Sequence, residues 1–250
     1  MTTQKPKVFI DPGHGGSDTG ASANGMSEHS INLEVSLLLS ERLQKCGIDT
    51  RLSRTTNVSL VYDQRWQMAN AWNADLFLSI HANAFNLPSA NGTEAFIYNN
   101  TQQVQRTNQA RKLAQTLLDL FVKRFNTTNR GVKLDTQSQH NGGLGVLRNT
   151  NMPAVLFELA FITAGAEYVD VDILRNRKPE IAQILADGIC KHLGINPETT
   201  VILPGHEPAE WAKEAWMWAM KNGITDGTRP LDGITRQETM RLLYNFYNTF

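Results

Sequence analysis

Short apolar runs alternate along most of this chain with longer segments in which apolar residues recur at helical spacing. The predicted strands lie at 8–10, 49–52, 76–81, 92–98 and 154–158. The predicted helices begin near 31, 60, 110 and 181 and end near 45, 74, 126 and 193. Residues 131–148 are looser, and we predict no regular element there. Strands that alternate with helices favour an α/β fold class with a mixed, largely parallel sheet flanked by helices.

The pattern changes at residue 196. Residues 196–206 contain Asn-Pro and Pro-Gly pairs and are predicted to be a linker between a first domain, 1–195, and a small α-helical C-terminal unit, 207–250. In that unit Thr235 and Glu238 have the spacing of a capping box that opens a second helix. Fewer than 50 residues is small for an independent core, so we expect dimerisation, or docking on the first domain, to stabilise it.

The charges of the chain are balanced, with 24 Lys and Arg against 24 Asp and Glu. A neutral chain gives no electrostatic reason to propose nucleic acid or an anionic membrane as the main partner. No apolar stretch approaches the roughly 20 residues of a membrane span. Residues 1–7 are polar and leave no room for the apolar core of a signal peptide. We therefore expect a protein made in the cytoplasm, or a mature form whose signal was removed.

Three of the predicted strands lead into side chains that can bind a metal or transfer a proton. His14 follows the first strand after an Asp-Pro-Gly turn, His81 ends the central apolar run, and Glu158 ends the last one. Because sites in open α/β sheets gather at the carboxyl ends of the strands, we expect these groups to share one site. We expect Asp11 to stabilise the loop that carries His14.

Glu28 immediately precedes the first helix and is the best third ligand to accompany the two histidines. Catalytic zinc takes three protein ligands and keeps one position for water, and His14, Glu28 and His81 fit that count. Glu158 would then be a carboxylate that takes the proton of the water and passes it to a leaving amine. Each histidine taken alone is better explained as a strand-end cap, and the spacing does not settle the ligand set.

Four stretches carry these groups in order along the chain. They are Phe-Ile-Asp-Pro-Gly-His-Gly-Gly at 9–16, the loop glutamate Glu28, Ser-Ile-His-Ala-Asn at 79–83 and Met-Pro-Ala-Val-Leu-Phe-Glu at 152–158. Together they resemble the zinc-dependent N-acetylmuramoyl-L-alanine amidase family, and the resemblance runs from about residue 7 to 193. It implies that His14, Glu28 and His81 bind one zinc ion and that Glu158 is catalytic. The implied reaction is hydrolysis of the amide between the lactyl group of N-acetylmuramic acid and L-alanine in peptidoglycan.

Two further residues are candidates for substrate binding. Asn83 and Arg148 could hold carbonyl or carboxylate groups of the substrate, or could equally be structural hydrogen-bond partners at strand ends.

The C-terminal unit resembles one S-layer-homology motif, through residues 211–215, 218–219, 223–227 and 234–238. Such motifs hold secondary cell-wall polymers, but usually occur in threes. A dimerisation hairpin explains a single copy about as well. Trp211 and Trp218 are predicted to pack inward on one helical face, which leaves Trp216 on another face to contact sugar or a second copy of the chain.

An amidase without a visible signal and with a wall-binding tail resembles a bacteriophage endolysin that causes host cell lysis. A bacterial autolysin or sporulation amidase is the alternative. A zinc peptidase that cuts within the stem peptide would use the same metal chemistry. A non-enzymatic wall-binding protein is less well supported, because all four candidate catalytic positions keep competent side chains.

Overall fold

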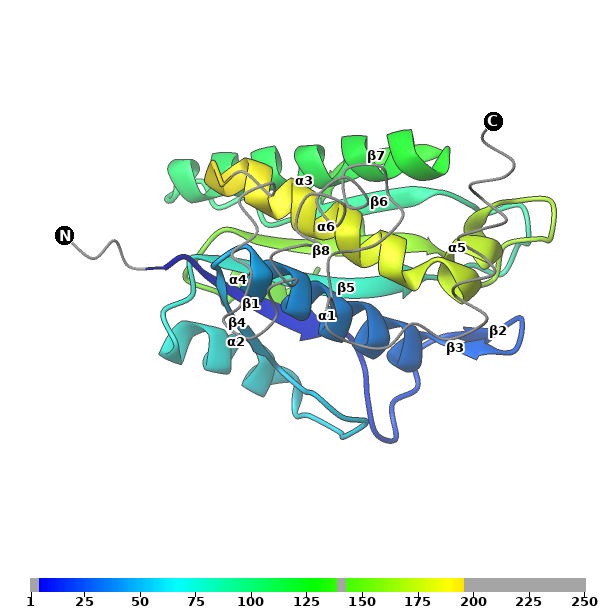
Figure 1. Ribbon diagram of the computed structural model, residues 1–250, viewed down its shortest axis with the longest axis horizontal. Helices are drawn as coiled ribbons and strands as arrows, with labels where there is room; N and C mark the ends of the chain where they lie inside the picture. The colour runs from blue at the N-terminus through cyan, green and yellow to red at the C-terminus, as the bar shows by residue number, and fades with distance from the viewer. Residues whose placement is uncertain (1–4, 139–142, 196–250) are drawn as a thin grey trace, which may run out of the picture. The chain divides into compact units, whose positions relative to one another are not determined.

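The computed structural model describes residues 5–138 and 143–195, and these residues form a mixed six-stranded sheet with helices on both faces (Figure 1). The strands are β1 (Lys7–Pro12), β4 (Asp49–Leu52), β5 (Leu76–Asn83), β6 (Thr93–Ile97), β7 (Asn129–Leu134) and β8 (Ala154–Phe161). Their spatial order is β4-β1-β5-β8-β6-β7. The first four in this order are parallel, β6 runs antiparallel to β8, and β7 is parallel to β6. The predicted fold class is confirmed.

Three long helices cover one face of the sheet (Figure 1). They are α1 (Glu28–Lys45), α3 (Val104–Phe125) and α6 (Lys178–Leu193), and α6 packs against both of the others. Each helix buries an apolar stripe, represented by Leu39 on α1, Phe121 on α3 and Ile189 on α6. The larger of the two hydrophobic clusters fills the space between these helices and the sheet. This face is therefore closed to ligands.

Within residues 5–138 and 143–195, only two short helices, α2 (Tyr62–Ala71) and α4 (Gly145–Arg148), pack on the opposite face. They cover the amino-terminal halves of the central strands, where Phe9 and Phe77 stack with ring centroids 5.8 Å apart. Because side chains on one face of a strand recur every second residue, the next positions on this face are Asp11 on β1 and Ser79 and His81 on β5. The carboxyl-terminal halves of the strands therefore present polar groups on the less covered face.

The expectation that residues 131–148 lack regular structure is wrong. This region contains most of β7, the single 3₁₀ turn Asp135–Gln137 and α4. The strand was missed because β7 is a half-exposed edge strand, which has polar residues and Gly131 in place of an apolar run. The short helix α5 (Asp170–Asn176) and the hairpin of β2 (Ser22–Ala23) and β3 (Met26–Ser27) were also not predicted.

Helix α6 ends as the sequence predicts, because Gly194 adopts a left-handed conformation with φ of 70° at its carboxyl end. The chain divides into two units, residues 1–200 and 201–250. The predicted linker at 196–206 and the unit at 207–250, with Trp216, lie outside the described residues, so these domain boundaries stay predictions. Among the described residues, none of the helices has the length and apolar character needed to cross a membrane.

Candidate metal centre and active site

The loop after β1 brings His14 over the carboxyl end of the sheet. His14 has a φ of 60°, and Gly15 and Gly16 also have positive φ, so the chain follows a left-handed path that glycine adopts most easily. The preceding Gly13 lies directly against the ring of His81 on β5. A Cβ atom at position 13 would lie 2.3 Å from ring atoms of His81, so only glycine lets the two histidine-bearing segments come this close.

The carboxylate of Glu28, the first residue of α1, lies between the two histidines. Its Oε1 atom is 3.1 Å from Nε2 of His14 and 2.9 Å from Nδ1 of His81. Its Oε2 atom accepts a hydrogen bond of 2.9 Å from the backbone N–H of Ala21. One ligand atom from each of the three residues lies within 4.8 Å of the others. The structure thus brings together His14, Glu28 and His81, as the sequence predicts.

This donor set suits zinc, which prefers imidazole nitrogen and carboxylate oxygen ligands. Burial alone would raise the pKa of the Glu28 carboxyl, but hydrogen bonds and charge from His14 and His81 outweigh it and hold that pKa well below its ordinary value. Glu28 is therefore ionised and ready to bind a cation. Burial also acts to lower the pKa of His14, but Glu28 and Asp18 outweigh it and raise that pKa.

Asp18 fixes the orientation of the His14 ring and was not predicted. Its Oδ2 atom lies 2.8 Å from Nδ1 of His14, which leaves Nε2 facing Glu28. A carboxylate on the outer nitrogen is the usual partner of a metal-binding histidine, because it sets the tautomer and increases ligand basicity. The sequence offered only a weak signal for this contact, an aspartate four residues after a histidine in a glycine-rich loop.

Glu158 occupies the middle of the site. On β8 it pairs in register with His81 of β5 on one side and with Glu94 of β6 on the other. Its Oε2 atom is shielded from solvent and has no hydrogen-bond partner among the described residues. Removal from water, followed by the negative charges of Glu28 and Glu94, raises the pKa of the Glu158 carboxyl well above its ordinary value. The Glu158 carboxyl therefore holds a proton more readily than the carboxyl groups of Glu28 and Glu94.

Glu94 behaves in the opposite way. Its carboxylate accepts hydrogen bonds from Nδ2 of Asn83 at 2.7 Å, from Nε of Arg130 at 2.7 Å and from Nζ of Lys133. Burial acts to raise the pKa of Glu94, but Lys133 and Arg130 outweigh it and lower that pKa. Neighbouring carboxyl groups with pKa values pushed apart are typical of acid–base sites. A glutamate inside an apolar strand was the signal that could have pointed to Glu94.

A cavity of about 770 Å³ connects these groups. The predicted site residues His14, Glu28, His81, Asn83, Arg148 and Glu158 all line it. Asn83 also accepts a hydrogen bond from the N–H of Ala84, and Nε of Arg148 donates to Asp135 at 2.8 Å. Both residues therefore have structural partners, and contact with substrate stays a prediction for them.

Three converging metal donors beside a protonatable carboxyl group are an arrangement suited to metal-assisted hydrolysis. The chain belongs to the N-acetylmuramoyl-L-alanine amidase family, because residues 8–191 match the sequence profile of that family, Amidase_3. The family predicted from the four motifs is confirmed.

Relatives of several kinds share this domain. The N-acetylmuramoyl-L-alanine amidase LytC of Bacillus subtilis is 35% identical over 183 residues, which are 72% of this chain and 34% of LytC. The chain thus matches about a third of LytC. The endolysin of Bacillus phage SPP1 is 34% identical over 206 residues, 80% of this chain and 70% of the endolysin. The crystal structure of an N-acetylmuramoyl-L-alanine amidase from Clostridium difficile 630 superposes with a TM-score of 0.68 and 30% identity, covering 77% of this chain and 98% of that one.

The contact between Gly13 and His81 gives a steric test of the centre. In Gly13→Ala the new methyl group must displace the His81 ring, so we expect zinc affinity to fall while the circular dichroism spectrum stays that of the wild type. Gly165→Ala is the control, because the three atoms nearest to its methyl group would all belong to the flexible side chain of Glu167. Zinc binding by Gly13→Ala that matches the wild type would show that His81 does not need this close approach.

Proposed function

We propose that this chain hydrolyses the amide between N-acetylmuramic acid and L-alanine in peptidoglycan, with one zinc ion held by His14, Glu28 and His81. The observation that carries the proposal is the convergence of both imidazoles on Oε1 of Glu28, beside the unpartnered carboxyl of Glu158. Membership of the amidase family supports the choice of bond.

The zinc ion, when bound, polarises the carbonyl of the scissile amide and lowers the pKa of the attacking water. Glu158 supplies the proton transfers. Its carboxylate form takes a proton from the attacking water, and the resulting acid gives that proton to the nitrogen of the leaving L-alanine. The raised pKa of Glu158 suits the second step, because the protonated form then persists until the amine leaves. Asp18 keeps the His14 ring in the tautomer that faces the metal position.

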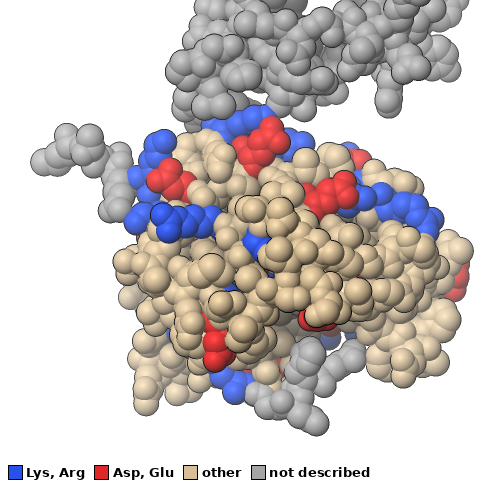
Figure 2. All heavy atoms as spheres, turned by 90° about the horizontal axis from the view of Figure 1, so that it is seen from below, with Lys and Arg blue, Asp and Glu red and all other residues tan. Residues whose placement is uncertain are grey.

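The proposed substrate is a polymer of sugars and short peptides. Figure 2, which views the protein from below, shows a surface on which most of the described side chains are uncharged. Such a surface suits a carbohydrate strand better than nucleic acid. Within the cavity, Arg148 and Asn83 are the residues we propose to contact carbonyl or carboxylate groups of the stem peptide.

The biological setting we propose is host cell lysis by a bacteriophage endolysin, with action at the cell wall after release. The endolysin of phage SPP1, which the chain matches over 70% of its length, supports this setting. A bacterial autolysin or sporulation amidase is the second candidate. It is favoured by the similarity to LytC and to the sporulation-specific amidase of Bacillus subtilis, which is 37% identical over 158 residues.

Metal dependence and bond choice are tested together on purified peptidoglycan. A chelator should abolish hydrolysis by the full chain, and added zinc should restore it, with new L-alanine amino termini and no new reducing sugar ends. His81→Ala should lose zinc and activity together, because two protein ligands remain. His29→Ala is the matched control, since its ring lies 3.2 Å from the carbonyl of Thr19 and takes no part in the donor set. New amino termini other than L-alanine would indicate a peptidase.

The role of Glu158 has a separate test. Glu158→Gln removes the proton acceptor but no metal ligand, so we expect full zinc content and a loss of turnover on the order of 10²–10⁴-fold. Glu41→Gln, on the exposed surface of α1, is the control and should leave both unchanged. Loss of zinc by Glu158→Gln would instead identify Glu158 as a ligand.

The C-terminal unit is proposed to bind secondary cell-wall polymer or a second copy of the chain. A chain ending at Ile195, just after α6, should keep its hydrolysis of soluble muropeptides and lose much of its action on intact walls, because tethering raises the local substrate concentration. In the full chain, Trp216→Ala should weaken wall binding or self-association without unfolding. Equal binding and lysis of intact cells by the truncated and full chains, both monomeric, would contradict both roles.

A further inference from the structure

Two buried arginines lie beneath the loop that carries His14. Arg54 follows β4 and is 3% exposed, and Arg65 on α2 is 8% exposed. Neither side chain is part of the donor set for the metal. Both donate to backbone carbonyl groups near it. A buried guanidinium group is costly unless it is well hydrogen-bonded, so the geometry of these bonds shows what the two side chains hold in place.

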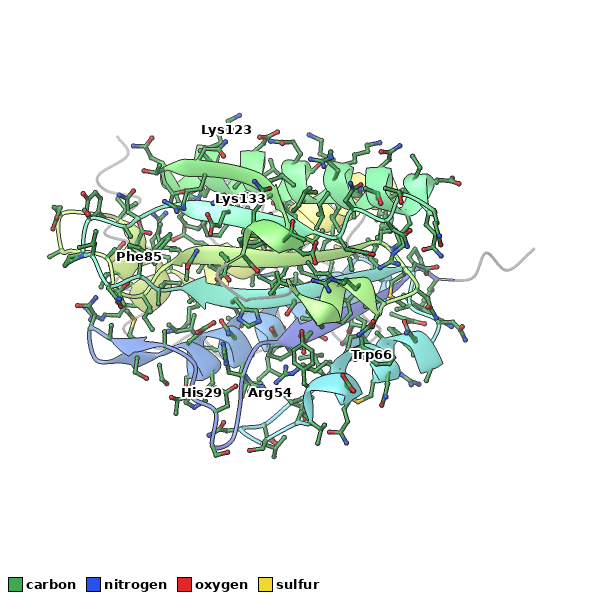
Figure 3. All side chains as sticks on the ribbon, turned by 180° about the vertical axis from the view of Figure 1, so that it is seen from behind. His29, Arg54, Trp66, Phe85, Lys123 and Lys133 are labelled. Atoms are coloured by element: carbon green, nitrogen blue, oxygen red, sulfur yellow. The ribbon has the colours of Figure 1, made fainter. Side chains whose placement is uncertain are left out.

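Arg54 joins two segments that carry metal donors. Its Nη2 atom donates to the carbonyl of Gly13 at 2.9 Å and to the carbonyl of His29 at 2.8 Å. Gly13 immediately precedes His14, and His29 immediately follows Glu28. Figure 3 shows Arg54 and His29 on neighbouring segments below the sheet. One nitrogen atom therefore fixes the spacing between the backbone at His14 and the start of α1 at Glu28.

Arg65 ties the same loop to the sheet. Its Nη2 atom donates to the carbonyl of His14 at 2.8 Å, and its Nη1 atom donates to Oδ1 of Asp11 at 2.7 Å. Asp11 also accepts a hydrogen bond of 2.8 Å from Oγ of Ser79, two residues before His81 on β5. From the sequence, Asp11 is expected to stabilise the loop that carries His14, and Asp11 does so through Arg65. Through Ser79 the same network reaches β5, the strand that carries His81.

The loop needs partners of this kind. The carbonyl groups of Pro12, Gly13 and His14 lie where β1 ends and the left-handed path at 14–16 begins, and buried carbonyl groups left without donors are costly. Arg54 and Arg65 donate to all three. A lysine in place of either has a compact ammonium group and cannot span the same set of acceptors.

We propose that Arg54 is a positioning residue of the metal centre, which sets the separation of His14 and Glu28 through the carbonyl groups of Gly13 and His29. The proposal rests on the zinc site of the proposed function. Arg65 sets the position of His14 relative to β5 in the same way. Removal of residues that orient metal ligands typically lowers metal affinity by about 10–100-fold, and this is the loss we expect for Arg54→Gln.

The test is zinc affinity of the full chain, measured by competition with a chromophoric chelator. Arg106→Gln is the matched control, because Arg106 on α3 also holds backbone carbonyl groups, those of Met152 at 2.9 Å and of Leu147 at 2.7 Å. Leu147 lies in α4 and Met152 in the segment that follows it, and neither belongs to the donor set. The visible absorption of the cobalt-substituted protein gives a second readout that reports ligand geometry directly. A loss of stability alone would change neither quantity in the folded protein.

We expect Arg54→Gln to bind zinc about 10–100-fold more weakly and to shift the cobalt spectrum, while Arg106→Gln matches the wild type in both. Arg54→Lys should also bind zinc weakly, since charge without the planar fork does not restore the spacing, and it serves if Arg54→Gln does not fold. Wild-type affinity and spectrum in either folded Arg54 variant would overturn the proposal. Absence of zinc binding by the wild type would instead overturn the proposed function.

Discussion

The two-residue period of the central strands decides where chemistry can occur in this domain. Every second side chain of β1, β5 and β8 enters the core beneath α1, α3 and α6, and the others face the side that α2 and α4 only partly cover. On that side the residues change from apolar to polar along each strand, from Phe77 to His81 and from Leu156 to Glu158. A shift of one residue in register would bury the polar groups in the core and close the site.

Three glutamates share the cavity, and their partners give them different charges. Glu28 is held ionised by two imidazoles, and Glu94 by Arg130 and Lys133. Among the described residues Glu158 has neither kind of partner, so burial, with the negative charges of Glu28 and Glu94 added to it, raises its pKa. A cation at the proposed metal position would reduce the repulsion between Glu28 and Glu158, because it would neutralise the former without binding the latter. The division of roles between ligand and proton carrier therefore follows from which carboxylate has fixed cationic partners.

Much of this arrangement could be predicted from the sequence. The apolar runs gave the strands, and the expectation of one shared site follows from parallel strands whose carboxyl ends meet. From the sequence, His81 and Glu158 are expected at the ends of their strands. In the structure β5 continues to Asn83 and β8 to Phe161, so both residues lie within strands. Edge strand β7 was missed because a half-exposed strand needs no apolar run.

The supporting residues could not be predicted in the same way. Asp18, Glu94 and Arg54 act through contacts between segments that are distant in the sequence or joined by an irregular loop. A buried arginine bonded to carbonyl groups has the same sequence signal as a surface arginine. Local patterns therefore identified the groups that can bind a metal, but not those that hold them in place.

The conformational free energy that the His14 loop costs explains why so many hydrogen bonds support it. A residue other than glycine with positive φ costs on the order of 1 kcal/mol, and His14 adopts that conformation next to two buried arginines whose charges repel. Burial and the positive charge of Arg65 lower the pKa of Arg54 to about 10, although the negative charge of Asp11 acts to raise it. Hydrogen bonds from Arg54 and Arg65 to the carbonyl groups of the loop offset this cost. The protein's own hydrogen bonds therefore support the loop that places His14 beside Glu28 and His81, the three candidate metal donors.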